Sequence, residues 1–315
     1  MMMAEQTLQD IGRALRETSA VDFVRASLKA GYQAYFPEQA ADRLVDDSLD
    51  QLAASQAQGV DAHQLADTAS RLGRLSFHHG DASFWFNRVY HHYKTELKPQ
   101  VDFEQLDRLI AGRRVLDYGC GSGYLAHRLA RGGYTVLTTD VLDYRYPEAR
   151  DLPFVKLASP SETPYGAGSA DTALVQAVLH HVHPPDLPAV IRGLARMAVT
   201  VLIKEDTYDL PADLPGLVDT LARQPLLQAF LALPRETQFQ ALVVIDFFAN
   251  VIAQGVSEMN LPFGFRPVPD WQSLLAANGL PVTRVIVSGF EPGRMHQSCH
   301  VWLVCRRGPD GAGGG

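Results

Sequence analysis

The first hundred residues carry apolar side chains at the spacing of an α-helix. Leu8, Ile11 and Leu15 recur at intervals of three and four positions, so they share one helical face. Similar segments follow, and residues such as Gly31 and Pro37 interrupt them. We therefore expect a helical domain over residues 1–100, which would act as a lid or substrate domain.

From residue 113 onward, short apolar runs alternate with helical segments. Such alternation predicts an α/β fold, in which helices cover both faces of a mainly parallel sheet. The expected strands are residues 114–118, 134–140, 172–179 and 198–204, and the expected helices are residues 124–131 and 185–196.

The C-terminal part adds an insertion and a pair of strands. Residues 208–271 read as helices followed by a loop, placed after the strand at 198–204, where a parallel sheet binds ligands at its carboxyl edge. A substrate cover and a structural appendage are both open interpretations of this insertion. Residues 282–290 and 299–305 are strands that could pair antiparallel across the turn at 291–294. The predicted division is a helical domain at 1–100, a sheet domain at 101–306 that includes the insertion, and a disordered tail at 307–315.

Composition excludes several classes of protein. The 315 residues include 28 Lys and Arg against 35 Asp and Glu, and the net charge of −7 disfavours binding to nucleic acid. The most apolar stretch, residues 241–253, is too short to span a membrane, and the N-terminus lacks the apolar core of a signal peptide. Three cysteines suit a reducing compartment. We expect a cytoplasmic protein with neither a membrane nor a nucleic-acid partner.

A glycine-rich loop is the strongest chemical signal. The strand that begins at Val115 leads into Gly119, Gly121 and Gly123, and a helix follows. Glycine permits a positive φ and lets the backbone approach a ligand closely, while the helix N-terminus offers free N–H groups. Asp140 lies at the end of the next strand, where an acid can bind the hydroxyls of a ribose.

The spacing of this loop distinguishes between cofactors. Dinucleotide sites prefer a third small residue one position later, where this chain has Tyr124. The G-x-G-x-G spacing, with Asp117 ahead of it, resembles motif I of the class I S-adenosylmethionine-dependent methyltransferases. Asp140 and the Leu-His-His-Val segment at 179–182 extend this resemblance over residues 113–306. The resemblance implies a Rossmann-like, doubly wound sheet with an antiparallel last strand.

The same resemblance implies roles for individual residues. Asp117 would hold the loop and a water or the amino group of the cofactor, Asp140 would bind the ribose, and Val141 would pack on the adenine. Many family members place an acid after the third strand, whereas this chain has Ser159, whose hydroxyl bonds an amine less strongly. The remaining implied cofactor residues are Gly119, Cys120, Gly121 and Gly123 at the methionine part, together with Gln176 and Tyr93.

Candidate groups for the chemistry follow the strands expected at 172–179 and 198–204. Methyl transfer needs mainly positioning, and a general base helps only where the acceptor must lose a proton. His181 and Asp206 are the candidate catalytic groups, and His180 is a candidate substrate contact. Three nearby residues, His183, Lys204 and Glu205, are further candidates. We expect no metal, because adjacent histidines should point apart and no Cys or Glu is spaced to complete a site.

Two other segments have both a structural and a functional interpretation. Phe86, Tyr90 and Tyr93 share a helix face, which would either pack on the sheet or place a tyrosine, Tyr90 as a catalytic candidate, over the cationic cofactor. Asp246 and Asn250 lie inside an apolar helix and need partners. They would either contact the substrate or bond to each other at i and i+4.

These observations favour transfer of a methyl group from S-adenosylmethionine to O, N or C of a small-molecule metabolite. The strand at 172–179 lacks the Asn/Asp-Pro-Pro-Tyr/Phe ending of enzymes that methylate bases or glutamine. One alternative keeps the cofactor but attacks its aminobutyrate carbon, as azetidine-2-carboxylate synthases and aminocarboxypropyl transferases do. Another is a binding module without catalysis. The sequence assigns neither the acceptor nor the oligomeric state.

Overall fold

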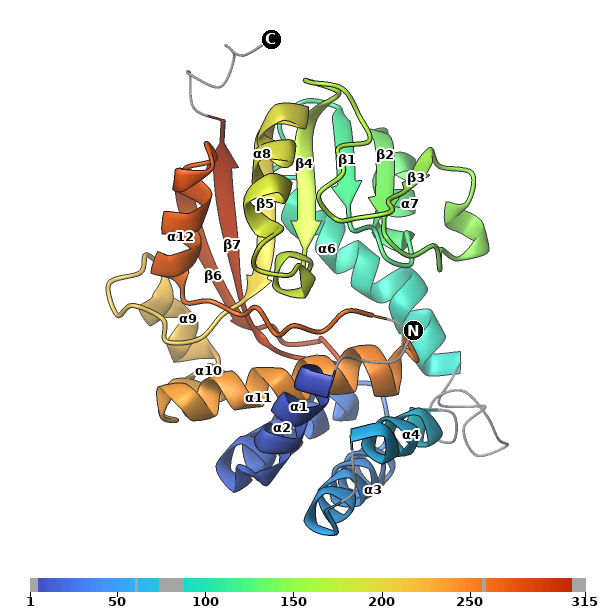
Figure 1. Cartoon of the computed structure of the whole chain (residues 1–315), viewed down its shortest axis with the longest axis vertical. Helices are drawn as coiled ribbons and strands as arrows, with labels where there is room; N and C mark the ends of the chain where they lie inside the picture. The colour runs from blue at the N-terminus through green and yellow to red at the C-terminus, as the bar shows by residue number, and fades with distance from the viewer. Residues whose placement is uncertain (1–4, 60–61, 74–87, 257–258, 308–315) are drawn as a thin grey trace. The chain divides into compact units, whose positions relative to one another are not determined.

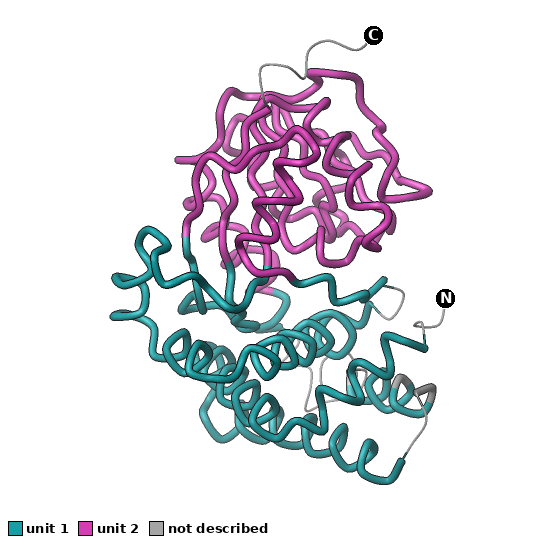
Figure 2. Tube along the Cα trace, turned by 60° about the vertical axis from the view of Figure 1, so that its left-hand side comes forward, with its two compact units in different colours: residues 1–91, 206–265, 287–300 teal, residues 92–205, 266–286, 301–315 magenta. Residues whose placement is uncertain are grey.

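The computed structural model describes residues 5–59, 62–73, 88–256 and 259–307 (Figure 1). The chain divides into two compact units, each assembled from separate stretches of sequence (Figure 2). Unit 1 contains residues 1–91, 206–265 and 287–300, and unit 2 contains residues 92–205, 266–286 and 301–315. Part of the predicted insertion therefore groups with the N-terminal helices. The predicted tail lies, from residue 308 onward, outside the described residues.

A mixed sheet organises unit 2. Within the described residues it has seven strands in the order β3-β2-β1-β4-β5-β7-β6. Strands β1 to β5 pair in parallel, and β7 runs in the opposite direction beside β5 (Figure 1). This is the predicted Rossmann-like fold, and the order reverses between β1 and β4, where such sheets bind ligands. The strands are β1 Arg114–Tyr118, β2 Thr135–Asp140, β3 Phe154–Lys156, β4 Ala170–Gln176, β5 Ala198–Asp206, β6 Val282–Phe290 and β7 Cys299–Arg306.

One predicted strand ends earlier than expected. The sequence predicted a strand over residues 172–179, but β4 ends at Gln176 because Ala177 has a φ of 53° and turns the chain. A short 3₁₀ turn, Leu179–His181, follows. The apolar residues beyond Gln176 therefore belong to this turn, although their pattern alone looks like continued strand.

Helices cover both faces of the sheet in unit 2. In the view of Figure 1, α8 lies in front of the strands and α7 behind them. Leu106 of α6, Leu129 of α7 and Val115 of β1 belong to one buried cluster, which joins the two helices to the sheet. The helical elements given for unit 2 are the π-helical turn η2 Tyr93–Leu97, α6 Lys98–Leu106, α7 Tyr124–Arg131, η3 Pro147–Ala149, η4 Leu179–His181, α8 Leu187–Met197 and α12 Val268–Ala277.

Unit 1 is mainly helical in its described part, and it also contains the end of β6 and the start of β7. Leu8, Ile11 and Leu15 are buried, which confirms the amphipathic pattern predicted for the first helix. Helix α11 packs against α1 and α2. None of the helices in the described ranges combines the length and apolarity that crossing a bilayer requires. The helices of unit 1 are α1 Glu5–Arg16, α2 Thr18–Gln33, α3 Glu38–Ala57, α4 Ala62–Gly73, α9 Leu217–Arg223, α10 Pro225–Leu231, α11 Arg235–Phe247 and the π-helical η5 Phe248–Ala253.

Candidate functional site

The glycine loop between β1 and α7 adopts a backbone that other residues disfavour. Gly119, Gly121 and Gly123 have φ values of +73°, +55° and +79°. At Gly119, an added Cβ would lie 2.5 Å from a methyl carbon of Val178, and at Gly123 it would lie 2.6 Å from the Cβ of Ala149. The loop therefore needs glycine for both its conformation and its close packing.

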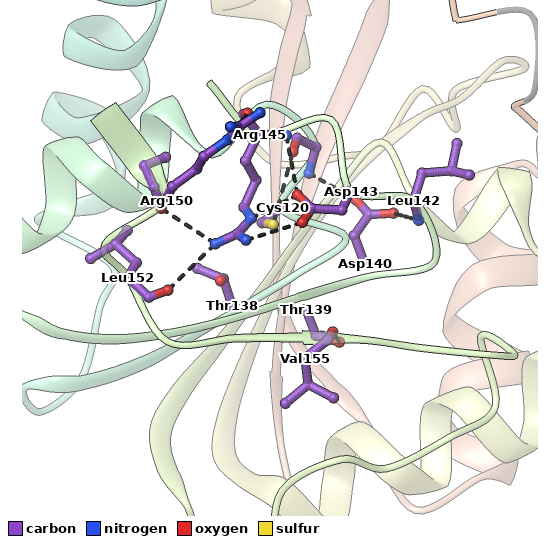
Figure 3. A network of polar contacts seen from close by, with 12 residues as sticks. Cys120, Thr138, Thr139, Asp140, Leu142, Asp143, Arg145, Arg150, Leu152 and Val155 are labelled. Atoms are coloured by element: carbon purple, nitrogen blue, oxygen red, sulfur yellow. Dashed lines mark hydrogen bonds and ion pairs between the residues drawn. The ribbon is translucent and has the colours of Figure 1, made fainter. Parts of the chain in front are cut away.

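Asp140 ties this loop to the end of β2. Its Oδ2 accepts a hydrogen bond from the Gly121 N–H at 2.8 Å, and its Oδ1 accepts one from the Leu142 N–H at 3.0 Å. Figure 3 shows the Asp140 carboxylate directed at Leu142. Burial raises the pKa of Asp140, and the backbone hydrogen bonds oppose that rise. Each oxygen retains a lone pair for a ligand hydroxyl, so ribose binding stays a prediction that this geometry permits.

Asp117 is a buried acid on the same sheet face as Val115, because alternate residues of a strand share a face. Only 4% of it is exposed, and no hydrogen bond from the described residues offsets the effect of burial on its pKa. Its pKa is raised to about 7, chiefly by burial and also by the nearby Asp140, while Lys98 opposes the rise. Lys98 is itself paired with the buried Asp102 at 2.8 Å. An acid in this setting suits a cationic ligand group.

The segment after β2 is organised by Arg145, which the sequence analysis missed. Its guanidinium pairs with Asp143 at 2.9 Å (Figure 3). The same guanidinium lies 3.9 Å from the ring centroid of Phe154. The hydrogen bond from Arg145 lowers the pKa of Asp143. Val141 remains 37% exposed at the start of this segment, as a residue that packs on a ligand ring would be. The sequence signal was the Asp143 and Arg145 pair, which closely follows Asp140.

The other implied cofactor residues all lie in unit 2, in different settings. The Ser159 hydroxyl is already hydrogen-bonded to the Ser161 hydroxyl at 2.9 Å. Burial raises the pKa of the Cys120 thiol, and Asp117 and Asp140 add to that rise, which fits a small loop residue rather than a nucleophile. The remaining two are Gln176, the last residue of β4, and Tyr93, which is buried at the start of η2.

The histidines after β4 occupy three different environments. His180 is fully buried, and its Nδ1 lies 2.5 Å from Oε2 of the equally buried Glu205. His181 is partly exposed, and His183 is exposed. The rings of His180 and His181 lie 4.1 Å apart at 46°. The expectation that adjacent histidines point apart is therefore wrong, because the 3₁₀ turn places these two rings against each other. A role for His180 at the substrate stays a prediction.

In unit 1, Asp246 and Asn250 are joined as the i and i+4 interpretation predicts. The Asn250 side-chain amide donates to Oδ1 of Asp246 at 2.7 Å and to the Asp246 carbonyl at 3.1 Å. Asn250 lies in the π-helical turn η5, a type of helical irregularity that is frequent at functional sites. The bond satisfies the Asn250 amide, and contact of either residue with a substrate stays a prediction.

Asp206 belongs to a chain of ionisable side chains in unit 1, in which His300 is partly exposed. Its Oδ1 lies 3.4 Å from Nε2 of His300, and Nδ1 of His300 lies 3.5 Å from Oε2 of Glu291. Glu291 is in turn 3.5 Å from Arg294. The turn between β6 and β7, which the sequence analysis treated only as a connection, thus supplies charged groups beside a candidate catalytic acid.

Helix α2 holds this same turn. The Tyr32 hydroxyl and Nε2 of His296 are 2.7 Å apart, and the Ser27 hydroxyl donates to the Gln297 carbonyl at 3.2 Å. The ring of Tyr90, the third candidate catalytic residue, lies 6.1 Å from that of His296. Phe86, which the helical pattern placed on the same face as Tyr90, lies outside the described residues. The sequence signal for this turn was the run of polar residues between the two apolar strands β6 and β7.

Parts of this chain are similar to known methyltransferases. Residues 89–252, more than half of the chain, match the family model described as a methyltransferase domain. Two relatives named ubiquinone biosynthesis O-methyltransferase are each 32% identical, that of Paracidovorax citrulli over 97 residues and that of Ralstonia nicotianae over 111 residues. These matches cover 28% and 32% of this chain but only 40% and 46% of the relatives.

Among solved structures, the 1,6-didemethyltoxoflavin-N1-methyltransferase of Burkholderia thailandensis aligns with 70% of this chain and 85% of its own. The sequence identity is 16% and the TM-score is 0.42.

Proposed function

Since this chain belongs to the methyltransferase-domain family, whose cofactor is S-adenosylmethionine, we propose that it methylates O, N or C of a small-molecule metabolite. The observation that carries this proposal is the glycine loop, whose Gly121 N–H is bonded to the Asp140 carboxylate. That bond joins the loop backbone that would approach the cofactor to the acid that would bind its ribose.

The residues of unit 2 fit this cofactor. Asp117 is a buried carboxylate, and it would pair with the cofactor ammonium. Asp140 would accept the ribose hydroxyls, and the exposed side chain of Val141 would cover the adenine. When bound, the cofactor supplies an electrophilic methyl group on a sulfonium, so the protein has only to align the acceptor and exclude water.

The acceptor is proposed to be a small molecule for two reasons. The net charge of −7 opposes binding to nucleic acid, and the two curated relatives are named O-methyltransferases of ubiquinone biosynthesis. An oxygen acceptor is therefore the first to test. A hydroxyl must lose its proton during methylation, and we assign this proton to His181 or Asp206.

The remaining candidate residues and the location of the enzyme follow from the same proposal. Tyr90 remains a candidate catalytic residue in this proposal, and His180, Asp246 and Asn250 remain candidate substrate contacts. Three free cysteines, two of them buried, favour a reducing compartment such as the cytoplasm.

Product analysis tests the proposal. The purified protein is incubated with S-adenosylmethionine, with and without a metabolite extract, and the products are identified by mass spectrometry. We expect S-adenosylhomocysteine and a methylated metabolite only when the extract is present. Methylthioadenosine formed without an extract would instead support attack on the aminobutyrate carbon, and unchanged cofactor under all conditions would support a binding module.

A further inference from the structure

We propose that Glu205 is a positioning residue for the cofactor loop, which acts by holding the turn after β4 so that Val178 packs against Gly119. All the residues involved belong to unit 2. The inference concerns the cofactor half of the proposed function and rests on it, but it is independent of the acceptor.

The turn after β4 begins at a strained residue. Ala177 has a φ of 53°, a region that residues with a Cβ rarely adopt. Its N–H is bonded to the Lys204 carbonyl at 2.8 Å. A strained backbone of this kind persists only where its surroundings determine it, and such positions cluster at functional sites. The neighbours of Ala177 must therefore supply the compensating interactions.

Glu205 supplies them from the end of β5. Its Oε1 accepts hydrogen bonds from the Val178 N–H at 3.1 Å and from the Leu179 N–H at 2.7 Å. Its Oε2 meets Nδ1 of His180 at 2.5 Å. One carboxylate thus binds three consecutive residues directly after Ala177. Because Glu205 has no exposed surface, these bonds form without competition from water and are stronger than the same bonds at a surface.

The restrained turn directs Val178 onto the glycine loop. A Cβ built on Gly119 would lie 2.5 Å from one methyl carbon of Val178 and 2.9 Å from the other. The opposite side of the loop is bound to β2, where the Gly119 N–H donates to the Thr139 carbonyl at 2.8 Å. The loop is therefore confined between β2 and the Val178 side chain. Movement of the turn would widen this space and loosen the backbone that approaches the cofactor.

The contacts of Glu205 indicate positioning rather than proton transfer. Both carboxylate oxygens are engaged by the turn, and the side chain is fully buried. A proton acceptor for the substrate would instead need an oxygen within reach of the ligand.

Calorimetric titration with S-adenosylhomocysteine, in the absence of any acceptor, tests the inference. The Glu205→Gln variant keeps the shape of the side chain but loses its charge, and we expect its Kd to rise about fivefold or more. Asp171→Asn is the matched control. The Asp171 carboxylate also accepts two backbone N–H groups, those of Arg113 and Arg114, but at the amino end of β4. The Kd of the Asp171→Asn variant for S-adenosylhomocysteine is expected to stay within twofold of the parent value.

Rescue by glycine separates positioning from a general loss of structure. Glycine adopts a positive φ without strain, so in an Ala177→Gly background the turn depends less on the carboxylate. We expect Glu205→Gln to raise the Kd less than twofold in that background. An equal loss in both backgrounds, or no loss in either, would overturn the inference.

Two further results complete the test. If Glu205→Gln does not fold, Val178→Ala replaces it, with an expected rise in Kd of threefold or more, and a Kd equal to that of the parent contradicts the inference. A parent protein that binds no S-adenosylhomocysteine would contradict the proposed function and this inference together. A parent that binds it, with variants that bind equally well, would contradict this inference alone.

Discussion

Replacement of Asp117 by Asn should stabilise the cofactor-free protein, and the gain should grow as pH rises. The reason is that Asp117 is 4% exposed and its pKa is raised from 3.8 to about 7, chiefly by burial. Between these two values the folded protein binds a proton that the unfolded chain has released. The stability of the parent therefore falls as pH rises through this window, and the full penalty is present above about pH 7.

The size of this effect follows from the pKa values. Each pH unit between the unfolded and folded pKa costs about 1.4 kcal/mol, so the complete penalty is about 4 kcal/mol. About 3 kcal/mol of it develops between pH 5 and pH 8. An Asn side chain cannot ionise, so the Asp117→Asn variant lacks this slope. The difference in unfolding free energy between variant and parent should increase by the same amount over that range.

Urea-induced unfolding at pH 5 and pH 8, without cofactor, measures this difference. Asp171→Asn is the control, because hydrogen bonds from Arg114 lower the pKa of Asp171 to about 2 and it titrates below the range tested. A difference between Asp117→Asn and the parent that is the same at both pH values would refute the reasoning. It would mean that the folded protein accommodates the Asp117 carboxylate in its charged form.

Three further predictions concern the same loop. Asp140→Asn should raise the Kd for S-adenosylhomocysteine at least tenfold by calorimetry, because a charge-assisted hydrogen bond is worth about 1.5–3 kcal/mol; an unchanged Kd would remove Asp140 from the ribose. Gly123→Ala should lower the free energy of unfolding by about 1–3 kcal/mol, since it imposes a φ of +79° on a residue whose Cβ would meet Ala149 at 2.6 Å; equal stability would contradict the strain. The affinity of the parent for S-adenosylmethionine should rise as pH increases through about 7, where Asp117 becomes charged, and Asp117→Asn should bind with little dependence on pH.

The glycine loop and the elements around it could be predicted from sequence because their causes are local. Glycine adopts the positive φ of Gly119, Gly121 and Gly123 without strain, and the helix that follows was predicted over the residues that form α7. Asp140 could be placed because a strand of definite length precedes it. In each case the residue type and its place beside a predicted strand were enough to identify the element.

The early end of β4 could not be predicted in this way. Ala177 has no intrinsic preference for a positive φ, and the apolar residues after it fit a strand equally well. The deciding interaction comes from Glu205, which is 27 residues from Val178 in sequence and reaches it only because β4 and β5 are neighbours in the sheet. Glu205 therefore looked like a candidate base in the sequence, whereas its contacts are those of a structural carboxylate.

The cofactor loop and the turn between β6 and β7 also differ in how far sequence could predict them. Residues of the loop act through their own backbone, so their types and spacing identify them. Asp206 and His300 are brought within 3.4 Å by the order of the last strands, and His296 meets Tyr32 across 264 residues. Side chains that act as partners have no fixed spacing, because burial of apolar faces, and not the polar residues themselves, determines which segments meet.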